Sequence, residues 1–174
     1  EVPEAQVREL AVPMGVVAAL VPTTNPTSTA IYKALIAVKG RNAIVASPHP
    51  RAAKCTAEAV NVLAQAAEAA GAPQGLIASL TNPTIEATNE LIRHKLVSII
   101  LATGSTPMVR AAYSAGKPAY GVGSGNVPAY IEKSANIRKA VADIVSGKVF
   151  DLGVLCSAEA SVIVDSVIKH VVVE

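Results

Sequence analysis

Cys156 is the residue whose type and surroundings point most directly to chemistry. It lies in residues 150–159, a short polar stretch with one glycine, between a helix-forming segment and an apolar run. A thiol on a loop between packed elements can meet a ligand, whereas a thiol inside an element usually cannot. We interpret Cys156 as a candidate nucleophile that takes up an acyl group. The alternative, a free cysteine that acts as a small buried hydrophobic residue, stays open from this loop alone.

Asn25 is a second candidate, because a side-chain amide can donate a hydrogen bond to a developing oxyanion. It precedes Pro26, and asparagine followed by proline is also a favoured helix start, with asparagine as the N-cap. The two roles are compatible, and the residues alone do not choose between them.

Two further segments could bring backbone close to a bound ligand: residues 103–107, Thr-Gly-Ser-Thr-Pro, and residues 121–126, Gly-Val-Gly-Ser-Gly-Asn. In the first, Thr106 could cap a helix, and the N-terminus of that helix could also face a phosphate or a nicotinamide carboxamide. The second differs from a dinucleotide fingerprint because its sixth position is Asn and an extended run follows. It predicts a turn, or a close approach of ligand and backbone.

The expected helix over residues 48–70 has an unusual charge pattern. Its first turns carry His49, Arg51 and Lys54, and its first acid is Glu58. Cations at a helix N-terminus oppose the helix dipole. A solvated face explains this pattern, and so does a bound anion such as a cofactor phosphate.

The elements that would position these residues alternate along the chain. We expect strands over residues 16–21, 42–46, 76–79, 98–102, 118–122, 127–131 and 161–165. We expect helices over residues 30–39, 48–70, 84–94, 106–115 and 137–148. Apolar strands that alternate with helices are typical of a parallel sheet covered on both faces, so we expect an α/β, doubly wound fold.

Four polar segments directly follow strands of this expected sheet. They are residues 22–28, 47–51, 103–107 and 121–126. Because parallel strands end at the same edge of a sheet, these segments would gather there, where such folds bind ligands.

The other cysteine and the histidines show no pattern of a site. Cys55 falls on the apolar stripe of the helix over residues 48–70, with Ala59 and Leu63, so we expect it on the core face. His94 and His170 have no ligand spacing with other His, Cys or acidic residues. We expect both histidines on the surface, and we predict no metal site.

Composition excludes several classes of protein. The 174 residues are 51% hydrophobic, enough for a globular core. The net charge of +2 is scattered and aromatics make up 3%, so nucleic-acid binding is not expected. No apolar run is long enough for a membrane span. Two cysteines do not form a disulfide framework, so a reducing cytoplasm fits best.

The ends of the sequence suggest that it is an excised piece of a longer polypeptide. It begins with Glu1 and not with Met, and it ends in residues 169–174 without a stop signal for the element begun there. A site could therefore be only half present.

Together, the motifs resemble the aldehyde dehydrogenase superfamily, and most of all its CoA-acylating branch. That branch includes acetaldehyde, propionaldehyde and succinate-semialdehyde dehydrogenases and the aldehyde half of bifunctional alcohol/aldehyde dehydrogenases. The matching segments are residues 13–17, 21–29, 41–45, 47–52, 103–105 and 121–128 and the Cys156 loop. The resemblance runs from about residue 10 to the end, and it implies the middle of a protein more than twice as long.

The resemblance implies a partial Rossmann-like NAD(P)-binding domain over residues 1–123 and the start of a second, catalytic α/β domain over residues 124–174. Cys156 would be the catalytic thiolate and Asn25 the oxyanion donor. The cofactor would be NAD or NADP, with coenzyme A as co-substrate, in a cytoplasmic homo-oligomer. The implied cofactor-binding residues are Pro22, Thr23, Ser47, Pro48, His49, Arg51, Gly104, Ser105, Gly121, Val122 and Gly123.

One departure from the family pattern concerns the reaction. Hydrolytic members carry a general-base glutamate at about the place of Gly121. Without such a base, water is a poor attacker on an acyl-enzyme, whereas the thiol of CoA ionises far more readily. The resemblance therefore implies the reaction aldehyde + CoA + NAD(P)+ to acyl-CoA + NAD(P)H, through a thioester on Cys156.

Other departures concern the ligands. Ser47 and Pro50 stand where hydrolytic relatives have a Lys and a Glu that hold the ribose, so a 2′-phosphate would meet no acid, and Arg51 could bind it. Leu152 stands where Asn is common, which could reshape the substrate pocket.

Three alternatives remain at this point. The protein could be a hydrolytic, CoA-independent aldehyde dehydrogenase with its base elsewhere. It could also be a catalytically silent nucleotide-binding fragment that binds cofactor without acylation of Cys156. A purely structural fragment would have no affinity for nucleotides.

Overall fold

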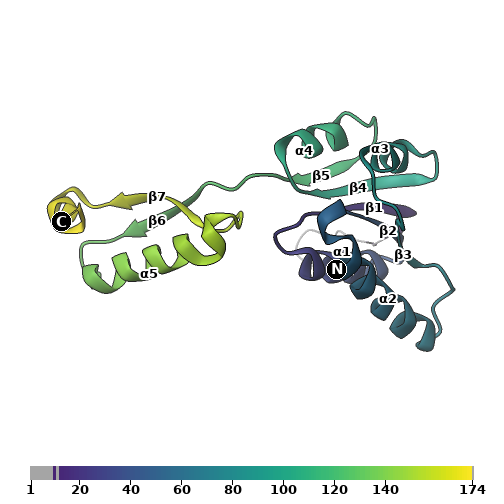
Figure 1. Cartoon of the computed structure of the whole chain (residues 1–174), viewed down its shortest axis with the longest axis horizontal. Helices are drawn as coiled ribbons and strands as arrows, with labels where there is room; N and C mark the ends of the chain where they lie inside the picture. Colours follow the sequence, from purple (N-terminus) through teal and green to yellow (C-terminus); the bar gives the residue numbers. More distant parts are fainter. Residues whose placement is uncertain (1–9, 11, 174) are drawn as a thin grey trace. The chain divides into compact units, whose positions relative to one another are not determined.

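A computed structural model of the chain describes residue 10 and residues 12–173. Residues 1–9, 11 and 174 lie outside the described residues, and with them the ends of the two domains expected from the sequence. The chain divides into two compact units, the first ending at Val122 and the second beginning at Gly123 (Figure 1).

The first unit is built on a five-stranded sheet with the order β3-β2-β1-β4-β5. All four strand pairs are parallel. The strands are β1 (Val16–Val21), β2 (Ala43–Pro48), β3 (Ile77–Ser79), β4 (Val97–Thr103) and β5 (Ala119–Val122). After β1, the chain adds β2 and β3 on one side of this strand. It then crosses back and adds β4 and β5 on the other side of β1. The carboxyl ends of β1 and β4 therefore form the switch point at which such sheets bind ligands.

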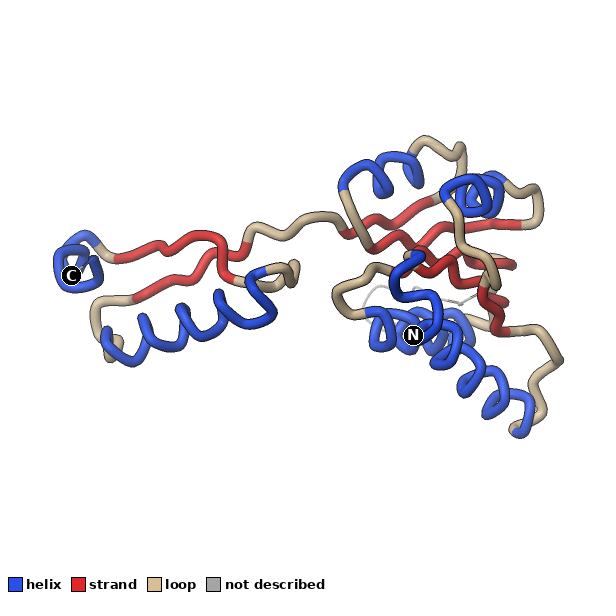
Figure 2. Tube along the Cα trace, viewed as in Figure 1, coloured by secondary structure: helices blue, strands red, loops and turns tan. Residues whose placement is uncertain are grey.

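Helices cover both faces of this sheet (Figure 2). On one face lie α1 (Pro26–Lys39) and α2 (Ala53–Ala69), which follows a short turn of 3₁₀ helix, η2 (Pro50–Ala52). On the other face lie α3 (Ile85–Arg93) and α4 (Thr106–Tyr113). The alternating side chains of β1 divide between two cores: Val17, Ala19 and Val21 join α1 and α2, whereas Ala18 and Leu20 join α3 and α4. The expected α/β, doubly wound fold is confirmed.

The second unit contains two parallel strands, β6 (Val127–Ile131) and β7 (Glu159–Val164), joined through α5 (Ile137–Val149). After α5 come a 3₁₀ segment, η3 (Phe150–Gly153), and the turn that holds Cys156. The last elements are η4 (Ser166–Ile168) and α6 (Lys169–Val173). None of the helices formed by residues 12–173 combines the length and the apolar character of a membrane span.

Several element boundaries differ from those expected. Helix α1 begins at Pro26 and not at residue 30, because the fixed φ of proline suits the first helical position. Strand β2 continues through Ser47 to Pro48, so the following helical segment begins only at Pro50. The N-cap of α4 is Ser105, one residue before the expected Thr106, and its side chain makes no capping bond.

The prediction that Cys55 lies on the core face is wrong. Cys55 is exposed, and its thiol donates to the carbonyl oxygen of Ala52 at 3.3 Å. Thr56 and Val60 face the core instead. Helix α2 contains many alanines around its circumference, so its apolar pattern does not define one face, and the expected stripe is displaced by about one residue.

The hydroxyl of Thr56 is fully buried and has no hydrogen-bond partner among the described residues. We expect Thr56→Val to raise the free energy of unfolding by about 1 kcal/mol, because it removes a desolvated hydroxyl without changing the side-chain shape. Urea unfolding of both proteins measures this change. The matched control is Thr84→Val, which loses the cap of α3, a 3.0 Å bond from the Ala87 N–H, and should lower stability by about 1 kcal/mol. A destabilised Thr56→Val protein would contradict this account.

Lys33 in α1 is a buried amine that should make stability depend on pH. It is 3% exposed, and its Nζ donates to the carbonyl oxygens of Leu20 at 2.7 Å and Leu101 at 2.8 Å. Burial lowers its pKa from 10.5 to about 7. Between these two values the unfolded chain holds a proton that the folded chain has released, so stability should rise with pH through this window.

The slope from Lys33 should reach at most about 1.4 kcal/mol per pH unit. Urea unfolding at several pH values from 7 to 10 measures it. In Lys33→Met this contribution should vanish, so the slope of the variant should be smaller than that of the original chain. Equal slopes would show that Lys33 is protonated when buried.

Candidate nucleotide and thiol sites

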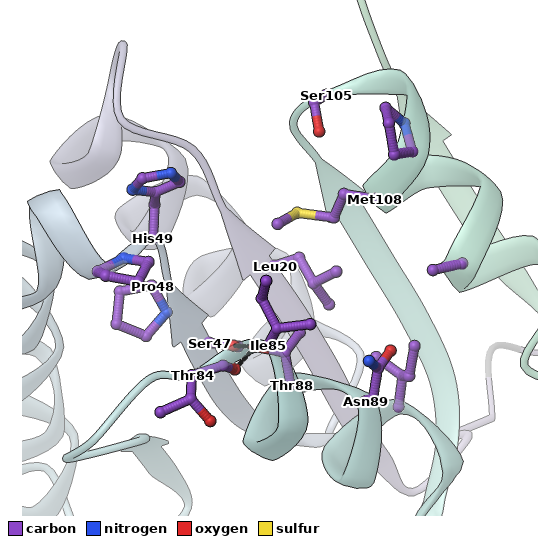
Figure 3. Close-up of a pocket in the computed structure, with 14 residues that line it drawn as sticks. Leu20, Ser47, Pro48, His49, Thr84, Ile85, Thr88, Asn89, Ser105 and Met108 are labelled. Atoms are coloured by element: carbon purple, nitrogen blue, oxygen red, sulfur yellow. Dashed lines mark hydrogen bonds between the residues drawn. The ribbon is translucent and has the colours of Figure 1, made fainter.

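A cavity of about 400 Å³ lies in the first unit at the switch point of the sheet (Figure 3). Leu20 of β1 borders it, and Ser47, Pro48 and His49 line it from the end of β2. The other walls come from α3 and from the start of α4, with Ile85, Thr88, Asn89 and Ile92 on the first and Ser105 and Met108 on the second. The cavity is thus mainly apolar, with a few polar groups, as expected of a small-molecule site.

A chain of hydroxyl groups crosses one wall of this cavity (Figure 3). Thr88 donates to the carbonyl oxygen of Thr84 at 2.8 Å, which occupies its only hydroxyl proton. The 2.7 Å bond between Ser47 and Thr88 must therefore be donated by Ser47. The oxygen of Ser47 keeps acceptor capacity for a ligand that carries an N–H or O–H group.

His49 contributes an imidazole ring whose tautomer follows from a hydrogen bond. Its Nδ1 accepts a hydrogen bond from the backbone N–H of Arg51 at 3.2 Å. An accepting Nδ1 carries no proton, so the proton of the neutral ring lies on Nε2, which can donate to a ligand. Among residues 12–173, those that line the cavity include no Asp or Glu, so none of them opposes an anionic ligand with a carboxylate.

Two helix N-termini lie at the same edge of the sheet. Helices α1 and α4 follow the carboxyl ends of β1 and β4, and neither has an acid in its first turn or a side-chain cap. Their backbone N–H groups keep a partial positive charge that no side chain offsets, which favours anions such as a phosphate.

The cavity gathers only some of the residues expected to bind cofactor. Ser47, Pro48, His49 and Ser105 line it. The other expected positions of the first unit follow or end strands near the same edge but are not part of its lining: Pro22, Thr23, Arg51, Gly104, Gly121 and Val122. Gly123 belongs to the second unit. His94 and His170, expected on the surface, are both exposed.

The contribution of α3 to the cavity was not expected from the sequence. Ile85, Thr88, Asn89 and Ile92 follow the i, i+3, i+4, i+7 spacing of one helical face. Thr88 and Asn89 form a polar pair inside this otherwise apolar helix face. Such a pair indicates that the face lines a site in addition to packing against the sheet.

Asn25 is the N-cap residue of α1 by position, but its side chain makes no capping bond. Its Oδ1 accepts a 3.1 Å hydrogen bond from the hydroxyl of Thr24, and its Nδ2 donates to none of the described residues. The side chain is exposed. The capping bond that was one interpretation of Asn25 is therefore absent, and its amide N–H groups are available to a ligand.

Cys156 is exposed and lies in a turn before β7, which the Ala158 N–H closes with a 3.1 Å bond to the carbonyl oxygen of Leu155. The alternative of a buried hydrophobic cysteine does not hold in this structure. Upstream, Asp151 and Leu152 have φ values of 49° and 54°. This left-handed region is uncommon for a bulky apolar residue, so the backbone at Leu152 is strained four residues before Cys156.

Gly121 is closely packed by the side chains of Val109 and Tyr113. A Cβ atom at this position would lie 2.5 Å from Cγ1 of Val109 and 3.0 Å from Cε2 of Tyr113. The backbone N–H of Gly121 also donates to the Tyr113 hydroxyl at 3.0 Å. A glutamate at this position would therefore require both neighbours to move.

The sequence matches the model of the aldehyde dehydrogenase family over residues 3–174. It is 56% identical over 156 residues to the aldehyde-alcohol dehydrogenase of Streptococcus pneumoniae, covering 90% of this chain and 18% of that protein. The chain thus spans less than a fifth of this relative.

Two solved structures are similar along nearly the whole chain. An acetylating aldehyde dehydrogenase from Geobacillus thermoglucosidasius is 62% identical with a TM-score of 0.85, covering 94% of this chain and 36% of that one. Rhodopseudomonas palustris propionaldehyde dehydrogenase, with bound CoA and an acylated cysteine, is 38% identical with a TM-score of 0.84, covering 93% and 37%. The family match, the parallel sheet and the exposed cysteine agree: the chain belongs to the aldehyde dehydrogenase family.

Proposed function

We propose that this chain carries the nucleotide-binding residues and the nucleophile of a CoA-acylating aldehyde dehydrogenase. The reaction is aldehyde + CoA + NAD(P)+ to acyl-CoA + NAD(P)H. The observation that carries this proposal is the glycine at position 121, which supplies no carboxylate at about the place where hydrolytic members of the family have their general base. Without a positioned base, hydrolysis of a thioester is slow, and a thiol acceptor is favoured. The acetylating name of one similar protein supports the same choice, and so do the bound CoA and the acylated cysteine of another.

The cavity of the first unit fits the adenosine part of a nicotinamide nucleotide. Its apolar walls suit a flat base, and Ser47 and His49 offer an acceptor and a donor for polar groups. The uncapped N-termini of α1 and α4 suit a pyrophosphate. When bound, the nicotinamide supplies the hydride acceptor. On this basis we assign residues 1–123 to nucleotide binding, including the positions outside the cavity lining.

Neither NAD nor NADP is disfavoured by charge. None of the described residues that line the cavity carries a carboxylate, and Arg51 follows the lining residues His49 and Pro50. We expect both nucleotides to bind. Removal of Arg51 should weaken NADP more than NAD if this side chain meets the 2′-phosphate.

Residues 124–174 form the start of the catalytic domain, and Cys156 performs the covalent step. Its thiolate attacks the aldehyde carbon, an S–C bond forms, and the carbonyl oxygen becomes an oxyanion that the Asn25 amide stabilises. Loss of hydride leaves a thioester on Cys156. The CoA thiolate then attacks this thioester, the bond to the Cys156 sulfur breaks, and the thiolate is restored.

The cellular location, the oligomeric state and the partners of the enzyme are also proposals. Both cysteines are free thiols, which fits a reducing cytoplasm. The family resemblance suggests a homo-oligomer that uses a small aldehyde and CoA and no nucleic acid.

The test is NAD(P)H formation from acetaldehyde with and without CoA, on this chain and on the longest polypeptide in which it occurs. We expect the rate without CoA to be lower by about 10²-fold or more, since no positioned base activates water. Equal rates would show a hydrolytic enzyme. Nucleotide binding without any turnover in either form would show a silent nucleotide-binding module.

A further inference from the structure

The turn that holds Cys156 lies beside Gly125 at the start of two neighbouring strands. Strands β6 and β7 are paired in parallel, with Val127 opposite Glu159. Gly125 comes two residues before Val127, and Cys156 comes three residues before Glu159. Parallel pairing thus brings the two segments together at the amino ends of the strands.

The contact between them leaves no space for a side chain. A Cβ atom on Gly125 would lie 2.0 Å from the carbonyl oxygen of Cys156 and 3.2 Å from its carbonyl carbon. Both neighbours are backbone atoms, so no rotation of a side chain can relieve the overlap. Gly125 does not have a positive φ, so the position requires the absence of a side chain and not the conformational freedom of glycine.

Gly147 in α5 offers a contrast within the same unit. A Cβ atom there would lie 2.5 Å from Oε2 of Glu159. This oxygen is the end of a flexible side chain, which can turn away at little cost. An alanine should therefore be tolerated at position 147 but not at position 125.

We propose that Gly125 is a positioning residue for the nucleophile. A side chain at this position must displace the Cys156 carbonyl, and the short turn from Leu155 to Ala158 moves with it. The thiol then leaves the place from which it attacks. This inference rests on the proposed role of Cys156 as nucleophile.

The experiment compares Gly125→Ala with Gly147→Ala in the full-length polypeptide, and peptide mapping after iodoacetamide treatment measures alkylation of Cys156 itself. We expect Gly125→Ala to lower kcat about 100-fold, because misplacement of a reacting group by about 1 Å has an effect of this size. Its iodoacetamide alkylation rate should also change several-fold. The KM and Kd for NAD(P) should stay within twofold, since the nucleotide cavity belongs to the first unit. Gly147→Ala should match the parent protein in every measurement.

Two outcomes would overturn the proposal. One is a Gly125→Ala protein with the kcat and alkylation rate of Gly147→Ala. The other is a Gly125→Ala protein that has lost nucleotide binding as well, because Gly125 would then support the whole fold and not the thiol. Failure of the proposed function gives another result, because Cys156→Ala would then keep full turnover. The alkylation rates of the two glycine variants would still show whether Gly125 positions the turn.

Discussion

Cys156→Ala should reduce turnover of aldehyde to acyl-CoA by about 10⁴-fold or more, because no other group on the proposed path can form the thioester. Binding of NAD(P) should be unchanged, since the described residues that line the proposed nucleotide cavity all belong to the first unit. Steady-state NAD(P)H formation and a nucleotide titration measure the two effects separately.

The matched control for this variant is Cys55→Ala. Cys55 is also an exposed free thiol, but it lies on α2 and donates only to the carbonyl oxygen of Ala52. Its substitution should change kcat by less than twofold. Substantial turnover by Cys156→Ala, or an equal loss in both variants, would remove Cys156 from the chemistry.

Asn25→Ala should lower kcat by about 10²- to 10³-fold, the usual effect of losing one oxyanion donor. The thermal stability of the protein should change little, because the Asn25 side chain makes no capping bond to α1. Asn25→Asp should be at least as inactive as Asn25→Ala, since a carboxylate repels the developing negative charge. Turnover rates and melting temperatures of the same samples give both readouts.

Asn136 is the control residue, because its substitution should lower stability and leave turnover unchanged. Its Oδ1 caps α5 by accepting from the Lys139 N–H at 3.1 Å. Asn136→Ala should cost about 1 kcal/mol of stability and leave the chemical step intact. If Asn25→Ala instead destabilises the protein and keeps its kcat, Asn25 is a structural residue of α1.

The fold was largely predictable because each strand of the first unit is a continuous apolar run. Val16–Val21 is buried between two layers of helices, and that environment leaves a clear sequence signal. Helix phase was harder to predict. In α2 the abundance of alanine hid the buried face, which is why Cys55 was placed on the wrong side.

The lining of the cavity was predictable where it lies at or after the ends of strands. Ser47, Pro48, His49 and Ser105 come directly after β2 and β4 or at the end of β2, and the cavity gathers them. The contribution of α3 was missed, because Thr88 and Asn89 contact the site through helix packing and not through a loop. The exclusion of a side chain at Gly125 depends on its close contact with the backbone of Cys156, a segment distant in sequence, which no local pattern reports.

The most direct test of the central claim is the intact mass of the protein after incubation with acetyl-CoA in the absence of NAD(P)H. Because acyl transfer is reversible, we predict the addition of one acetyl group, mapped to Cys156 by peptide analysis, absent from Cys156→Ala and removed by excess CoA. An unmodified mass, or acetylation at another residue that persists in Cys156→Ala, would contradict a thioester on Cys156 that is passed to CoA.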